Sequence, residues 1–159
     1  MAGKSRRWDI VAIGLVAVVA IFLRTYRPGI WNANWDELNI MFWAQRIARY
    51  GDWIWVSNNW VGWGVGWNPI TRHSAVSNYT VALPYLFTGN PLVIRAYVGL
   101  LGALSIILTT DAVRRPAGRW PALVAGMMFA VSIATNEATR RVINSNLALF
   151  WIGLWVWTA

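Results

Sequence analysis

Cysteine is absent from the 159-residue chain, and His73 is its single histidine. Disulfide frameworks, thiolate metal sites and thiol nucleophiles are therefore excluded, and so is a metal site built from several histidines. Acidic residues are scarce as well, because six Asp and Glu stand against fourteen Lys and Arg. An ion bound by carboxylates stays open, since hard cations prefer oxygen ligands.

Apolar residues dominate the rest of the sequence. Hydrophobic residues make up 57% of it, charged residues make up 13%, and there are thirteen tryptophans. This composition is typical of a protein in a bilayer and not of a soluble domain. The net charge of +8 comes largely from arginines scattered between apolar segments, without the basic stripe of a nucleic-acid-binding fold. We therefore expect membrane lipids, and no nucleic acid, as the anionic partner.

Four apolar stretches predict membrane-spanning helices. They lie at about residues 8–26, 91–110, 120–135 and 142–159, and a long polar and aromatic segment, residues 28–90, separates the first two. A turn at residues 111–119 joins the second and third. Six basic residues precede the first stretch or lie in this turn: Lys4, Arg6, Arg7, Arg114, Arg115 and Arg119. The positive-inside rule places them in the cytoplasm, so segment 28–90 lies outside.

Two observations bear on this topology. A cleaved signal peptide is the alternative for the first stretch, but Arg24-Thr25-Tyr26-Arg27 follows where a small-x-small cleavage site would stand. Eight of the fourteen basic residues fall outside, three of them in the loop 28–90, which is long enough for the positive-inside rule to be weak. The predicted fold is an all-α, polytopic helical bundle of the plasma (inner) membrane. Its N-terminus is cytoplasmic, and its large outer loop carries interfacial amphipathic helices.

Two helices are expected in the outer loop. The first covers residues 35–50 and should lie along the membrane interface. Its apolar residues follow the i, i+3, i+4, i+7 spacing: Ile40, Trp43, Ala44 and Ile47. The second covers about residues 75–87 and is broken near Pro84. Between them, the glycine- and tryptophan-rich run 60–69 is either a mobile aromatic flap that contacts sugar or lipid, or an aromatic belt at headgroup level.

Two adjacent carboxylates, Asp36 and Glu37, open the first of these helices. Asn34 is the expected N-cap, Glu37 at the third helical position fits a capping box, and Gly51 fits a C-terminal stop. Asp36 is left in the first turn. Its simplest role is to complement the helix dipole, by ~0.3–1 kcal/mol. The alternative is that Asp36 acts as a general base.

Several motifs follow one another along the chain: Trp35-Asp36-Glu37 through Gly51-Asp52-Trp53, then His73, Tyr85-Leu86-Phe87-Thr88-Gly89, Pro91-Leu92-Val93-Ile94-Arg95 and Arg140-Arg141-Val142-Ile143-Asn144-Ser145-Asn146-Leu147. Their order and spacing resemble the N-terminal portion of GT-C glycosyltransferases, in the bacterial branch similar to protein O-mannosyltransferases and the aminoarabinose transferases of lipid A. The resemblance covers about residues 10 to 159. Two departures stand out. His73 is followed by Ser74 instead of a double proline, and the family has many more spans. The chain is therefore expected to be an N-terminal fragment that is inactive alone.

The resemblance implies an inverting transferase of the cell envelope. It would move a sugar from a polyprenyl-phosphate-linked donor to a hydroxyl of a lipid, glycan or protein acceptor on the non-cytoplasmic face. Asp36 would be the general base, with Glu37 as the second catalytic candidate. The residues that would bind the donor or its lipid phosphate are His73, Arg95, Arg140, Arg141 and Asn144. No cofactor is implied. Some relatives hold a divalent ion between acidic side chains, for which Asp36 and Glu137 are the candidates here.

A non-catalytic membrane protein, either a small scaffold or a piece of a transporter, is the alternative from another class. A transporter normally carries polar residues in the middle of its spans. The runs 10–23, 96–110 and 120–134 hold almost none. This favours chemistry at the outer surface, and hence the transferase.

Overall fold

The computed structural model describes residues 2–27, 35–51, 75–132, 142 and 144–159. Within these ranges the chain forms six helices and no strand: α1 (Ala2–Thr25), α2 (Trp35–Tyr50), α3 (Ala75–Tyr85), α4 (Pro91–Ala117), α5 (Arg119–Val131) and α7 (Asn144–Thr158). The all-α class is confirmed. Two helices contain an apolar stretch long enough to cross a bilayer, Trp8–Thr25 in α1 and Pro91–Ala117 in α4.

The last two expected spans coincide with shorter apolar helices, Arg119–Val131 and Leu147–Thr158. Helix α5 has 13 residues. At a rise of 1.5 Å per residue it extends roughly 20 Å, against about 30 Å for the hydrocarbon core of a bilayer. The described part of the third expected span is therefore too short to cross a bilayer by itself, and residues 133–135 of that span lie outside the described ranges.

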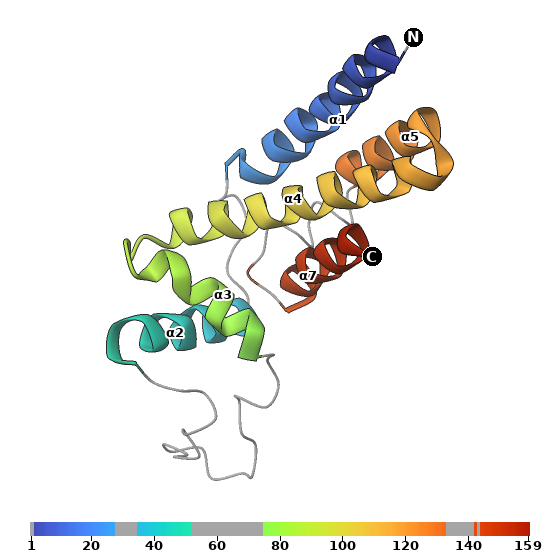
Figure 1. Ribbon diagram of the computed structural model, residues 1–159. Helices are drawn as coiled ribbons and strands as arrows, with labels where there is room; N and C mark the ends of the chain where they lie inside the picture. The colour runs from blue at the N-terminus through green and yellow to red at the C-terminus, as the bar shows by residue number, and fades with distance from the viewer. Residues whose placement is uncertain (1, 28–34, 52–74, 133–141, 143) are drawn as a thin grey trace.

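Helix α4 is the centre of the fold (Figure 1). Helices α1, α5 and α7 all pack against it, and α3 joins it from the α2–α3 pair near its N-terminal end. Asn90 caps this end, because its side-chain oxygen accepts the Leu92 N–H at 2.9 Å, and Pro91 occupies the first turn. At the other end, Gly118 follows the last residue of α4 with a φ of 84°. That left-handed conformation suits glycine.

The turn expected at residues 111–119 is mostly helix, because α4 continues to Ala117 and only Gly118 separates it from α5. Asp111 pairs with Arg114 and Arg115 on the same helix, at 2.8 and 3.7 Å. Ion pairs at spacings of three and four residues stabilise a helix. The polar composition of residues 111–119 therefore marks the end of the apolar stretch and not the end of the helix.

Glycines allow two helices to approach α4 closely. A Cβ atom on Gly99 would lie 2.6 Å from the carbonyl oxygen of Arg24 in α1. A Cβ atom on Gly126 of α5 would likewise overlap the side chain of Thr110 in α4. Close backbone approach at small residues is how helices associate in a membrane, where lipid is as apolar as the helix surface. These contacts hold α1 and α5 against the central helix.

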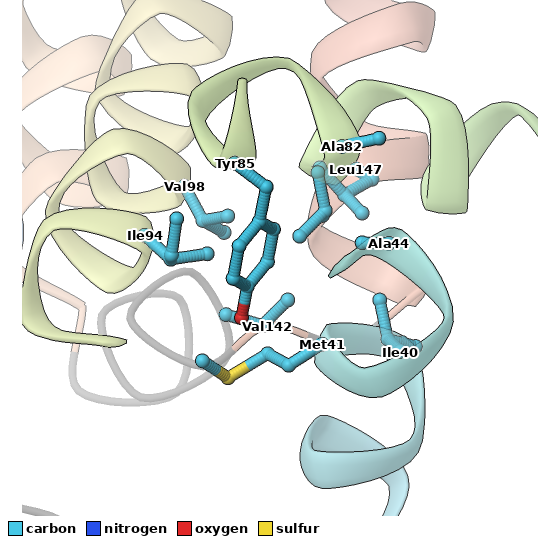
Figure 2. Packing of buried hydrophobic residues seen from close by; sticks show 10 residues of the cluster. Ile40, Met41, Ala44, Ala82, Tyr85, Ile94, Val98, Val142 and Leu147 are labelled. Atoms are coloured by element: carbon cyan, nitrogen blue, oxygen red, sulfur yellow. The ribbon is translucent and has the colours of Figure 1, made fainter. Parts of the chain in front are cut away.

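Helices α2 and α3 pack together beside the N-terminal end of α4. The bounds expected for α2 are confirmed, and Gly51 follows it with a φ of 67°. Helix α3 ends at Tyr85, two residues before the expected end, with Pro84 in its last turn. Ten buried residues form the core between these helices and α7 (Figure 2): Ile40, Met41, Ala44, Val81, Ala82, Tyr85, Ile94, Val98, Val142 and Leu147. This core packs α2 on α3 and brings the start of α2 within side-chain reach of α4.

Candidate functional site

The central polar feature at this junction is a buried ion pair between α2 and α4. Arg95 donates from Nε to Oε1 of Glu37 at 2.8 Å and from Nη2 to Oε2 at 2.9 Å. The backbone N–H of Val142 donates to the same Oε1 at 3.3 Å. Glu37 is fully buried, and Arg95 is 9% exposed. A bidentate, charge-assisted pair of this kind fixes both side chains in one geometry.

The apolar core explains why this pair is buried. Glu37 lies in the first turn of α2, one turn before Ile40, and Arg95 lies one turn before Val98 in α4. Residues one turn apart share a helix face, and both apolar neighbours are fully buried in the core. Removing two charges from water costs several kcal/mol, and well-formed hydrogen bonds between the two groups are what counter that cost. The pair therefore joins the start of α2 to the start of α4 and, through Val142, to the segment before α7.

Tyr85 of α3 lies in the core close to the pair. Its hydroxyl points toward Val142 and Met41 (Figure 2). Burial raises the pKa of this hydroxyl above its ordinary value of 10.0; the positive charge of Arg49 opposes the rise, and the negative charge of Glu37 adds to it. Burial disfavours the charged phenolate. Tyr85 is therefore a neutral hydroxyl at physiological pH and not a candidate base.

The structure brings two of the expected site residues together, Glu37 and Arg95. Asp36 lies in the first turn of α2, as expected, and Asn144 is the first residue of α7. The side chains of these last two are outside the described part of the structure. Four further expected residues lie outside it entirely: His73, Glu137, Arg140 and Arg141. The sequence alone does not predict that Glu37 and Arg95 bind each other. Contact of Arg95 with a lipid phosphate stays a prediction.

Two other expectations also depend on residues that the structure does not describe. The capping box of Glu37 needs Asn34, and the ion site needs Glu137. Among the described residues, no group of three or more His, Cys, Asp or Glu side chains is placed to hold a metal ion. The capping box and the ion site both stay predictions.

Arg24, near the end of α1, is a buried cation that no sequence motif marks. Its guanidinium donates to carbonyl oxygens of Ala130 at 3.2 Å, Phe129 at 3.3 Å and Ala20 at 3.4 Å. The first two lie in the last turn of α5, where carbonyl groups lack helical partners and a positive charge is favoured. An arginine that ends an apolar run ordinarily extends to the headgroups, so only the position of α5 reveals this role.

The Asn78-Tyr79-Thr80 sequence has the pattern of an N-glycosylation acceptor. Asn78 is in α3 and is only 1% exposed. An acceptor asparagine must reach the transferring enzyme, so this pattern does not mark a modification site in the folded chain.

Comparisons with known proteins find no relative of this chain. No protein-family model matches it, and no match is found among curated proteins or solved structures. Its function is therefore inferred from its residues and their geometry.

Proposed function

We propose that the chain is part of an inverting GT-C-type membrane glycosyltransferase, which moves a sugar from a polyprenyl-phosphate carrier to an acceptor hydroxyl on the non-cytoplasmic face. The observation that carries the proposal is the buried pair of Glu37 with Arg95, at 2.8 and 2.9 Å. This pair holds the first turn of α2 against α4. Glu37 is then a positioning residue, and its neighbour Asp36 is the carboxylate that we assign to proton transfer.

The arrangement of charges supports an outward-facing site. Arg114 Nη1 lies 3.1 Å from Asp9 Oδ2, so the N-terminal part of α1 lies beside the C-terminal part of α4. The arginines of the α4–α5 turn are at this end of the bundle, which the positive-inside rule assigns to the cytoplasm. Helices α2 and α3 lie at the opposite end of α4 (Figure 1). In this topology Asp36 lies where a lipid-linked donor and a water-soluble acceptor meet.

The proposed reaction forms one bond and breaks one. The acceptor oxygen attacks the anomeric carbon from the side opposite the carrier phosphate, while Asp36 takes the hydroxyl proton. The phosphate leaves with the electron pair of its bond to the sugar, so the anomeric configuration inverts. Positive groups stabilise the charge on the leaving phosphate. Arg140 and Arg141 are assigned to it, since Arg95 is engaged with Glu37, and the remaining donor contacts are assigned to His73 and Asn144.

The test is Asp36→Asn in the longest protein that the gene encodes, assayed with a panel of polyprenyl-phosphate hexoses. The amide keeps the shape of the side chain and removes the proton acceptor. Turnover should fall ~100- to 10,000-fold while donor binding is nearly retained. Asp9→Asn is the matched control, because it removes a carboxylate at the other end of the bundle. An Asp36→Asn protein that keeps more than roughly a third of wild-type turnover would show that Asp36 is not the base.

A non-catalytic scaffold is the second candidate, and one observation favours it over a piece of a transporter. The polar side chains of α4 between its ends bond to carbonyl oxygens of their own helix, Ser105 and Thr109 at 2.8 Å and Thr110 at 2.7 Å. Hydroxyls satisfied in this way do not form the polar path that a transported solute needs. Absence of transfer by the wild-type protein from every donor in the panel would favour the scaffold.

A further inference from the structure

The turn between α4 and α5 presents positive charge at the end of the bundle away from α2 and α3. Arg115 lies in the last turn of α4, Gly118 is the single linking residue, and Arg119 begins α5. The side chain of Arg115 is 48% exposed, and the neighbouring Trp120 is 65% exposed. Charge and aromatic surface therefore lie together at this turn.

The acidic groups near the turn are held mainly by other partners. Arg114 contacts Asp9 at 3.1 Å and Asp111 at 2.8 Å. The other oxygen of Asp111 accepts the indole N–H of Trp157 at 3.0 Å, and Arg115 reaches it only at 3.7 Å. Arg114 is therefore neutralised within the bundle. Arg115 is exposed and Arg119 is half-buried, and neither has an acidic partner closer than 3.7 Å among the ion pairs of the described residues.

Each of these two arginines also lies against a tryptophan. The guanidinium carbon of Arg115 is 5.3 Å from the ring centre of Trp157, and that of Arg119 is 5.2 Å from the ring centre of Trp120. Cation–π contact holds each guanidinium against an apolar ring. Tryptophan is also the residue type that gathers at headgroup depth. The two pairs thus form a surface that is both cationic and suited to the membrane interface.

Some hydrogen-bond donors at the α4–α5 turn have no acceptor in the described part of the chain. In the described part of the chain, no side chain caps the start of α5, and the buried Nε of Arg119 has no hydrogen-bond partner. The first N–H groups of a helix lack helical partners and attract anions. An anion with several oxygens, placed beside Arg119, would accept from its Nε and from the backbone N–H groups of Arg119 and Trp120, the two that the first turn offers before Pro121.

We propose that Arg115, Arg119 and the first turn of α5 bind the phosphate of an acidic phospholipid in the leaflet that surrounds this end of the bundle. The occupant is a lipid because the exposed ring of Trp120 gives the acyl and glycerol parts an apolar surface beside the phosphate. Its phosphodiester supplies the negative charge and the oxygen acceptors. This site is at the opposite end of α4 from Asp36 and does not depend on the proposed sugar transfer.

Energy transfer to dansyl-phosphatidylglycerol tests the proposal, with the full-length protein in phosphatidylcholine nanodiscs. Arg115→Gln/Arg119→Gln leaves all thirteen tryptophans of this chain as donors. Each arginine near an anionic surface contributes about fivefold to binding, so the double variant should bind about 25-fold more weakly at low ionic strength. Arg46→Gln is the matched control and should bind as wild type does. Arg46 likewise lies against aromatic rings, 5.9 Å from those of Phe42 and Trp43, but on α2.

Competition separates the sources of phosphate. Unlabelled phosphatidylglycerol should displace the probe, whereas phosphatidylcholine or inorganic phosphate at the same concentration should not. Displacement by inorganic phosphate as effective as by the lipid would overturn the lipid assignment, and so would double-variant binding within twofold of wild type. If the double glutamine variant does not fold, Arg115→Lys/Arg119→Lys replaces it. Lysine keeps the charge and loses the guanidinium fork, so weaker binding supports the site and unchanged binding overturns it.

Discussion

Replacing Glu37 by glutamine should destabilise the fold far more than loss of a surface ion pair would. The substitution keeps the length of the side chain and removes its charge, so the guanidinium of Arg95 stays buried without a counter-ion. One oxygen that accepts from Arg95 also becomes an amide group, which places a donor against a donor. The side chains are 0% and 10% exposed, so water cannot replace the lost contact. Breaking a buried pair on one side costs ~3–5 kcal/mol.

A double-mutant cycle gives the measurement. Glu37→Gln, Arg95→Met and the double variant are unfolded by titrating mixed detergent micelles with sodium dodecyl sulfate, with helix content followed by circular dichroism. The double variant should lose less stability than the two single variants together, with a coupling free energy of about 2–3 kcal/mol. Asp9 with Arg114 is the control pair, at 3.1 Å but with side chains 22% and 31% exposed. Exposed pairs contribute ~0–1 kcal/mol.

A coupling below ~0.5 kcal/mol for Glu37 and Arg95 would refute the reasoning, because that is the error within which independent substitutions add. It would mean that the pair does not hold α2 against α4. That result would also refute the assignment of Glu37 as a positioning residue for Asp36, whatever the outcome of the Asp36→Asn assay.

Two further predictions concern topology and packing. The chain has no cysteine, so single cysteines can be introduced and labelled one at a time. Those at residues 5 and 116 should be labelled only from the cytoplasm, and those at residues 60 and 138 only from outside. Cytoplasmic labelling at residue 60 would reverse the orientation and move Asp36 to the cytoplasmic face. Gly99→Ala should destabilise the bundle by ~1–3 kcal/mol through overpacking, because its Cβ would lie 2.6 Å from the Arg24 carbonyl oxygen, whereas Gly14→Ala, with nothing within 4 Å, should not. Equal unfolding midpoints for the two alanine variants would contradict close contact between α1 and α4.

The parts of the fold that local signals determine could be predicted from the sequence. Helix α2 covers the predicted residues 35–50, and Gly51 follows it with a φ of 67°, because helix ends depend on residues within one turn of them. The end of α4 could not be predicted in the same way. Asp111 and the arginines after it indicate a departure from the apolar stretch, yet the same residues pair along the helix surface and extend it to Ala117. The composition of a run reports its environment, whereas the spacing of its charges decides whether the helix continues.

The candidate site shows the limit of local interpretation more clearly. The sequence marks both Glu37 and Arg95 as site candidates, but it assigns Glu37 to a capping box in its own helix turn and Arg95 to a lipid phosphate. Their pairing is a contact between residues 58 positions apart, and it follows only once the core has placed the start of α2 on α4. Arg24 is a second case, since two of its three acceptors are 105 and 106 positions away. A charge beside an apolar segment has two low-energy arrangements, contact with water and headgroups or pairing inside the protein. Sequence favours the first because it shows no partner. Only the packing of the helices shows that these two arginines adopt the second.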